Sequence, residues 1–199
     1  LLIPSNLQMV GTIIMDNLNG NEQFDYEFTR CLVKTNEDES PQQDFDYVDR
    51  VTGGTNILLY GVPGSGKSWT IEHEYCNEDS IVERLVFHPD YTNADFVGQI
   101  LPVVDEDKQV TYEFTPGPFT TILSNAYRNP MSKYILIIEE INRGNAPAIF
   151  GEVFQLLDRK VEMQDGDDGF PVGTSEYGIT HKYMAEFIYG KPSHKVRIP

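Results

Sequence analysis

One short stretch, Gly61 to Thr70 (GVPGSGKSWT), limits the folds open to this 199-residue chain more than any other. It follows the apolar run Asn56 to Tyr60 and matches the pattern G-x-x-x-x-G-K-[ST] in full, ending on Gly66, Lys67 and Ser68. Glycines let successive N–H groups curl toward one point, and a helix that starts there adds the positive end of its dipole. The stretch therefore predicts a phosphate-binding turn between a buried strand and a helix.

The residues of this turn have distinct expected roles toward a nucleoside triphosphate. Lys67 would reach the β and γ phosphates, and Ser68 would place its hydroxyl on Mg²⁺. We expect the ring of Trp69, the next residue, to pack on the helix rather than stack on a base. The predicted nucleotide-binding segment consists of Gly61, Val62, Pro63, Gly64, Ser65, Gly66, Lys67, Ser68 and Trp69.

A second group of polar residues ends the apolar run Tyr134 to Ile138, within the stretch ILIIEEINRGN. Phosphoryl transfer needs a carboxylate near the metal ion and another group that orients or deprotonates the attacking water. Glu139 and Glu140 fit these two roles, because adjacent residues on a strand point in opposite directions. In isolation the pair could equally be a solvated strand end, but a phosphate-binding turn upstream favours the functional interpretation.

Hydrophobic periodicity predicts an α/β fold around these two motifs. Strands are expected at 56–60, 84–88 and 134–138, and helices at 68–76, from Pro118 to before Pro130, and at 146–158. Alternating strands and helices indicate a parallel sheet flanked by helices. Between 161 and 195 glycines interrupt the pattern, and we expect Tyr183 to Tyr189 to be a strand in a β-hairpin insertion.

Composition restricts the classes of partner. With 15 basic and 31 acidic residues the formal charge is −16, so the surface as a whole should repel a nucleic-acid backbone. The two cysteines, Cys31 and Cys76, lie far apart without zinc-ligand spacing, as in a reducing compartment. No apolar run approaches the roughly 20 residues of a membrane helix, and the first residues lack secretory-signal features, so we expect a cytoplasmic protein.

Four segments together resemble the AAA+ domain of the McrB-like restriction NTPases: GVPGSGKS, LVFHPDYTNADFVGQILP, GPFTTILSNAYRNP and YILIIEEINRGNAPAIFGEVFQLLD. The resemblance spans about residues 54 to 199. It implies a P-loop NTPase of AAA+ type that forms a ring, expected to be a hexamer, and acts with an McrC-like nuclease on DNA. It also implies Mg²⁺ with GTP or ATP as cofactors, and leaves the choice of base open.

Carried over residue by residue, the resemblance makes Lys67 and Ser68 the Walker A pair, Glu139 the metal-side carboxylate and Glu140 the catalytic base. It places Asn142 and Arg143 near the nucleotide and the neighbouring subunit. The general pattern has aspartate where this chain has Glu139, so the carboxylate here stands one methylene further out.

The amino-terminal segment raises a question of chain order. After a KVRIP-like segment the family continues with a sensor strand, whereas here Ile3 to Thr12 (IPSNLQMVGT) resembles that continuation from the other end of the chain. We therefore divide the chain into an N-terminal segment, 1–50, and a P-loop core, 51–199. One hypothesis is that the chain is rotated, with Leu7 to Val10 lying parallel between the strands at 56–60 and 134–138. An unrelated extension is the alternative.

Two other functions remain open at this stage. One is a different P-loop enzyme, such as another ATPase or a small-molecule kinase, and the other is a non-catalytic nucleotide-binding subunit. His88, in FHPDY, is either a functional histidine or a packed residue at the end of its strand.

Overall fold

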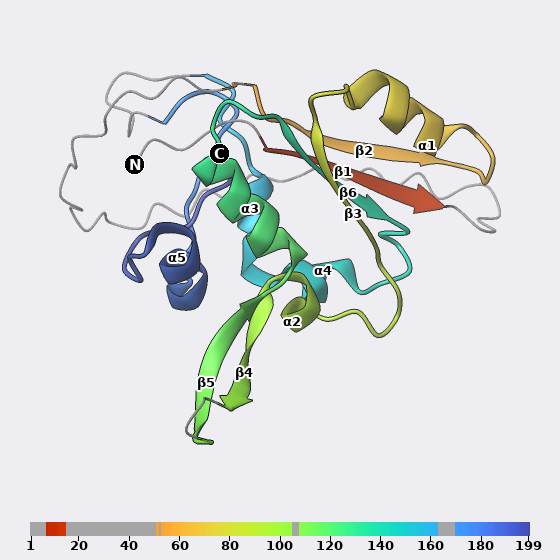
Figure 1. Ribbon diagram of the computed structural model, residues 1–199. Helices are drawn as coiled ribbons and strands as arrows, with labels where there is room; N and C mark the ends of the chain where they lie inside the picture. Colours follow the sequence, from red (N-terminus) through yellow and green to blue (C-terminus); the bar gives the residue numbers. More distant parts are fainter. Residues whose placement is uncertain (1–6, 15–50, 52, 105–107, 163–169) are drawn as a thin grey trace.

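The computed structural model describes residues 7–14, 51, 53–104, 108–162 and 170–199, and for 7–14 only the backbone. Its centre is a four-stranded parallel sheet in the order β2-β1-β6-β3 (Figure 1). The four strands are β1 (Leu7–Ile14), β2 (Asn56–Gly61), β3 (Ile81–Val86) and β6 (Tyr134–Glu139). Helices flank this sheet, so the predicted α/β class is confirmed.

Strand β1 lies where the rotation hypothesis places it. It pairs in parallel with β2, with Met9 opposite Asn56, and with β6, with Gly11 opposite Ile138. The expected position of Leu7 to Val10 is thus confirmed. The rotation of the chain itself remains a hypothesis, as does the division at residue 50, since residues 15–50 are outside the described part.

Most predicted elements on the P-loop side are present. Helix α1 (Lys67–Thr70) continues into a π-helical turn, η1 (Ile71–Tyr75), so the chain is helical nearly as far as predicted. Helix α3 (Pro118–Arg128) begins at its proline, and α4 (Ala146–Phe150) runs on as a 3₁₀ helix, η2 (Gly151–Leu157). Strand β3 begins three residues earlier than predicted, and the Phe87 N–H still donates to the Glu139 carbonyl beyond its end.

The predicted strand at Tyr183 to Tyr189 is wrong, and so is the hairpin insertion around it: these residues form helix α5 (Lys182–Tyr189). Its buried side chains, Met184, Ala185 and Ile188, recur at helical rather than alternating spacing. The His181 ring accepts the Met184 N–H at 3.1 Å, and Gly190 ends the helix in a left-handed conformation with φ 66°. These two caps outweigh the β propensity of the aromatic residues.

A hairpin does occur, but elsewhere. Helix α2 (Asn93–Phe96) leads into β4 (Gly98–Val104), which pairs antiparallel with β5 (Val110–Pro116) before α3 begins. The hairpin projects from the body of the molecule (Figure 1). Its side chains are mostly exposed, so the burial pattern that marks a strand in sequence is weak there.

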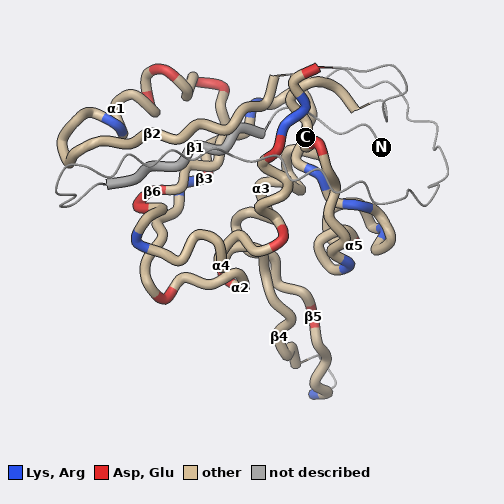
Figure 2. The backbone as a smooth tube through the Cα atoms, turned by 180° about the vertical axis from the view of Figure 1, so that it is seen from behind, with Lys and Arg blue, Asp and Glu red and all other residues tan. Residues whose placement is uncertain are grey.

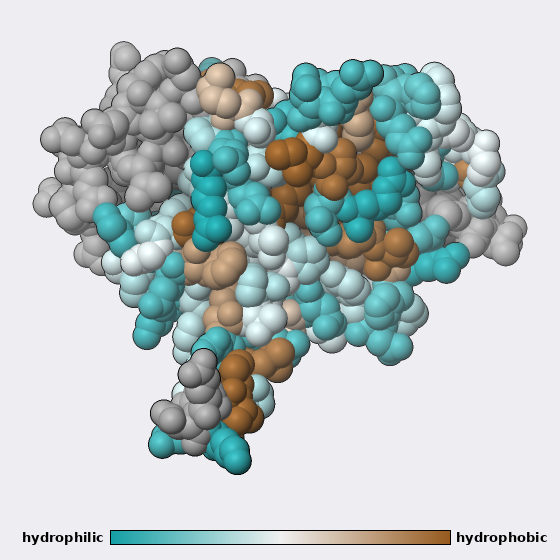
Figure 3. Space-filling view, viewed as in Figure 1, coloured by the Kyte–Doolittle hydropathy of each residue, from teal (hydrophilic) through white to brown (hydrophobic). Residues whose placement is uncertain are grey.

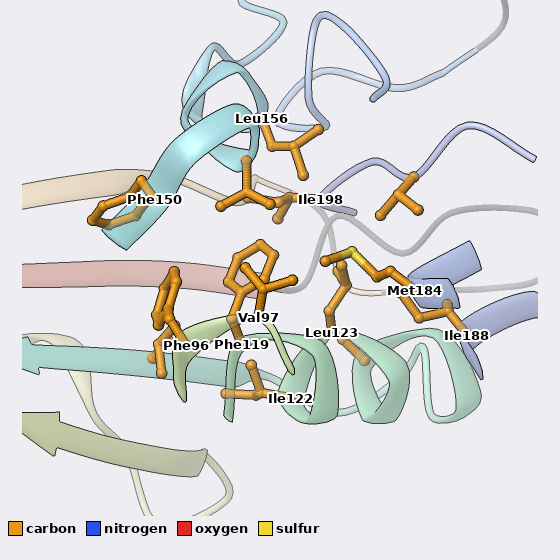
Figure 4. Close-up of a cluster of buried hydrophobic side chains, with 14 of the residues drawn as sticks. Phe96, Val97, Phe119, Ile122, Leu123, Phe150, Leu156, Met184, Ile188 and Ile198 are labelled. Carbon is orange, nitrogen blue, oxygen red and sulfur yellow. The ribbon is translucent and has the colours of Figure 1, made fainter. Parts of the chain in front are cut away.

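Among the residues whose side chains the structure describes, which exclude strand β1, the two faces of the sheet bury very different amounts of side chain. On one face a large cluster joins α2, α3, α4 and α5, and Figure 4 shows Phe119 and Leu123 of α3 pointing toward Leu156 and Ile198. On the other face the cluster contains Ile71, Ile135 and Ile137, with Ile57, Leu59 and Cys76 packed against it. Strand β6 contributes side chains to both clusters, because alternate residues of a strand point to opposite faces of the sheet.

A half-buried arginine attaches the carboxyl-terminal segment to the sheet. Arg159 donates to the Pro199 carbonyl at 3.1 Å and to the Asn56 side chain at 3.3 Å, at the start of β2. Burial lowers the pKa of Arg159 to about 10, so the group remains protonated at neutral pH. Within the described ranges, no helix combines the length and the apolar character that crossing a bilayer requires.

Candidate nucleotide-binding site

The phosphate-binding turn lies at the carboxyl end of β2, between that strand and α1. Gly64 and Gly66 have φ of 76° and 86°, a left-handed conformation that strains any residue with a Cβ atom. Open space surrounds both positions where a Cβ would stand, and the turn is largely exposed. The backbone is thus wound as the sequence pattern requires, with its outer side accessible to an anion.

Lys67 folds back over this turn. Its ammonium group donates to the Gly61 carbonyl at 2.8 Å and to the Val62 carbonyl at 3.0 Å. Ser68 follows on the exposed start of α1. An ammonium group, a hydroxyl and a glycine-rich backbone are the donors that phosphate oxygens require, so the residues present fit a nucleotide's phosphates.

Trp69 packs on its own helix, as expected, although it stays largely exposed. Its side chain is 59% exposed, and its ring stacks on that of His73, one turn further along, with centroids 4.2 Å apart. Its inclusion in the nucleotide-binding segment stays a prediction.

The two glutamates end β6 at the same edge of the sheet as the turn, because the strands are parallel. Strand β1 lies between β2 and β6, so β6 is not the direct neighbour of the P-loop strand. Two strand spacings make a separation of roughly 10 Å. In Figure 2, one basic position at the start of α1 and acidic positions at the end of β6 are coloured at this edge.

Glu139 and Glu140 are held differently. Glu139 continues the alternation of Ile135 and Ile137 and therefore faces the side of the sheet that α1 and η1 cover. Its Oε1 accepts from Arg84 Nη1 at 2.7 Å. Glu140 leaves the strand with φ 55°, a left-handed conformation that costs a residue other than glycine on the order of 1 kcal/mol.

The segment after Glu140 is a compact turn. The Arg143 N–H donates to the Glu140 carbonyl at 2.8 Å, and Arg143 Nε lies 2.7 Å from Glu140 Oε2. Gly144 is tightly packed, since a Cβ there would approach Ile149 to 2.6 Å. Asn145 caps α4 by accepting the Ala148 N–H. The structure thus joins Arg143 to the proposed base, while Asn142 lies exposed beside it.

His88 stands just beyond β3, at the same edge of the sheet. It is exposed, with its ring edge-on to Tyr91 at 5.4 Å, so the packed interpretation does not hold for the whole side chain. Burial, with Asp95 and Glu83 nearby, raises the pKa of the Tyr91 hydroxyl.

Comparison with known proteins decides the family. The family model for the AAA domain of the dynein-related subfamily matches residues 56–188, from the P-loop strand to α5. The chain belongs to this family. The predicted P-loop fold of AAA type is therefore confirmed, and a domain of this type binds nucleotides.

Two relatives come from restriction systems. The chain is 36% identical over 142 residues to the type II restriction enzyme BsuMI component YdiS of Bacillus subtilis (strain 168), covering 59% of this chain and 40% of the relative. It is 30% identical over 145 residues to the type IV methyl-directed restriction enzyme EcoKMcrB subunit of Escherichia coli (strain K12), covering 70% and 30%. The resemblance to McrB-like AAA+ proteins is confirmed, although the chain spans less than half the length of either relative.

Proposed function

We propose that this AAA domain hydrolyses GTP or ATP as the motor of an McrBC-like DNA restriction system. One observation carries the proposal: the phosphate-binding turn after β2 and the glutamates that end β6 lie at one edge of one sheet, separated by a single strand. The similarity to two components of restriction systems supports the biological setting.

Each residue of the site then has a chemical role. Lys67 leaves the loop carbonyls to contact the β and γ phosphates, while the turn's N–H groups hold the remaining phosphate oxygens. Ser68 and Glu139 would hold Mg²⁺, which prefers oxygen ligands such as hydroxyl and carboxylate. When bound, Mg²⁺ neutralises charge on the β and γ phosphates.

Glu140 would orient and deprotonate the attacking water. The fixed left-handed backbone at Glu140 and the contact with Arg143 determine where its carboxylate points. A base must lie within hydrogen-bond reach of the proton that it removes. Because Arg143 contacts the Glu140 carboxylate, it would hold that carboxylate in position. Arg143 would also lie near a neighbouring subunit. Asn142 shares that exposed position.

Assembly and partners follow from the same proposal. A ring, expected to be a hexamer, would bring a second subunit against the exposed turn at Asn142 and Arg143, and an McrC-like nuclease would cut the DNA. With a formal charge of −16, this chain would contact DNA through another domain or through its partner. We expect the protein to act in the cytoplasm.

A hydrolysis assay with GTP and ATP in parallel tests the proposal, using the wild-type chain and Glu140→Gln. Turnover of one nucleotide that collapses in Glu140→Gln, with binding retained, supports the enzyme. Binding without turnover in either protein would indicate a non-catalytic subunit, and transfer of phosphate to a small-molecule acceptor would indicate a kinase.

A further inference from the structure

An arginine that the sequence motifs do not include contacts the proposed metal-side carboxylate. Arg84, on β3, donates from Nη1 to Glu139 Oε1 at 2.7 Å and from Nη2 to Glu72 Oε1 at 3.1 Å. The guanidinium therefore divides its two arms between two carboxylates on different elements, the end of β6 and the η1 turn that follows the P-loop helix.

Strand register explains why these three side chains meet. Arg84 is opposite Ile137 and Val86 is opposite Glu139, so all four side chains face the side of the sheet that η1 covers. Glu72 follows Ile71, the η1 residue that packs into the small cluster with Ile137. The packing of Ile71 on Ile137 thus brings the carboxylates of Glu72 and Glu139 to the guanidinium of Arg84.

Solvent still reaches this group. The side chains of Arg84, Glu139 and Glu72 are 37%, 26% and 55% exposed. Exposed ion pairs contribute little to stability, so a purely stabilising role would be small. Figure 3 shows apolar side chains gathered over the sheet beside α1, and exposed Val82 and Val86 flank Arg84 along β3.

The ion pair between Arg84 and Glu139 matters for where it lies, at the proposed Mg²⁺ ligand, more than for its contribution to the stability of the fold. A carboxylate whose oxygen is bound by a guanidinium is a poorer ligand for a second cation, and the positive charge of Arg84 adds repulsion. Arg84 would have to release Glu139 for that carboxylate to reach Mg²⁺. Glu72 offers the guanidinium an alternative acceptor, and so favours that release.

We propose that Arg84 is a positioning residue that competes with Mg²⁺ for Glu139, and that Glu72 sets the outcome by holding Arg84. The inference rests on the proposed function, in which Glu139 is a metal-side ligand. Arg84 would thereby couple Glu72, which follows the P-loop helix, to Glu139 at the end of β6, so that Mg²⁺ binding changes the contacts of both.

Equilibrium binding of fluorescent GTP and ATP, titrated with Mg²⁺ at fixed protein concentration, tests the inference without any need for turnover. Arg84→Gln should lower the Mg²⁺ concentration at the binding midpoint by about three- to tenfold, because the competing cation is gone. Glu72→Gln should raise it by about two- to threefold, because Arg84 then pairs with Glu139 alone.

The double variant separates competition from a simple change of charge. If Glu72 acts through Arg84, then Arg84→Gln with Glu72→Gln should have the same midpoint as Arg84→Gln alone. Additive shifts would instead show two independent charges and would overturn the proposal. Unchanged midpoints in both single variants would overturn it as well.

Controls separate this inference from folding and from the proposed function. Arg128→Gln removes an exposed cation at the end of α3, near the opposite edge of the sheet, and should leave the midpoint unchanged. Thermal melting without nucleotide reports folding. If Arg84→Gln unfolds, Arg84→Met replaces it, because methionine also removes the charge and keeps an unbranched apolar stem on the strand. A wild-type chain that shows no Mg²⁺-dependent binding would refute the proposed function itself, and this inference with it.

Discussion

One face of the central sheet carries most of the described hydrophobic core, and the other carries the proposed nucleotide-binding residues. Of the side chains described, those on the face under α3 and α5 form a continuous cluster of aromatic and aliphatic residues, whereas three on the face under α1 and η1 are fully buried. The phosphate-binding turn, Glu139 and Arg84 all belong to the thinly packed face. Since local stability follows buried apolar contact, this face should open more easily and adjust more when a nucleotide binds.

Removing the proposed base should give the largest effect and leave stability nearly unchanged. We expect Glu140→Gln to reduce hydrolysis by about a hundredfold to ten-thousandfold, because the water loses its proton acceptor while the phosphate contacts remain. Steady-state phosphate release measures the loss. Glu113→Gln, at an exposed position on β5, is the matched control. Undiminished turnover in Glu140→Gln would remove Glu140 from the mechanism.

Truncating the large cluster should have the next largest effect, on folding. Phe119 is fully buried and lies against Phe96 with ring centroids 5.1 Å apart. Phe119→Ala should lower the free energy of unfolding by about 3–5 kcal/mol, measured by urea denaturation. Asn125→Ala, exposed on the same helix, should change it little. A loss below 1 kcal/mol would mean that this face is not the stabilising one.

The matching truncation on the thin face should cost less stability and more function. Ile71→Ala should lower the free energy of unfolding by about 2–3 kcal/mol, less than Phe119→Ala, because fewer neighbours surround the cavity. It should also weaken nucleotide binding several-fold, since Ile71 anchors the helix that carries Lys67. Glu74→Ala serves as the exposed control. Equal nucleotide affinity in Ile71→Ala and Phe119→Ala would mean that the face under α1 and η1 has no special role in nucleotide binding.

The smallest expected effect concerns the helix that sequence patterns read as a strand. His181 caps α5 through its ring nitrogen, so His181→Ala should lower the free energy of unfolding by about 1 kcal/mol. Glu186→Ala, exposed on the same helix, should have a negligible effect. An unchanged stability in His181→Ala would show that other contacts hold α5.

Sequence predicts the parts of this fold that depend on local rules. The phosphate-binding turn needs glycines at fixed positions, and β6 is apolar on both sides, so both are visible in one stretch of residues. The position of β1 followed from likeness to a family rather than from its own periodicity. Helix α5 was hidden because Tyr183, Phe187 and Tyr189 favour strands, while its caps lie outside the stretch.

The site shows the same limit. Glu139 and Glu140 are evident in the sequence as carboxylates at a strand end. The left-handed backbone at Glu140, with the Arg143 N–H donating to its carbonyl, has no such signal in the sequence. Arg84 gives one signal in the sequence: it is the one cation in β3, next to Glu83 and between Val82 and Val86 on its own face. Its partners could not be named without the register of β3 against β6, which tertiary structure alone sets.

Hydrogen–deuterium exchange with and without a non-hydrolysable GTP or ATP analogue and Mg²⁺ shows where on the sheet the nucleotide binds. We expect slower exchange in residues 61–75 and 139–145 on nucleotide binding, with little change in α3 and α5. Protection confined to α3, α5 or the β4–β5 hairpin, with the P-loop turn unaffected, would contradict this expectation.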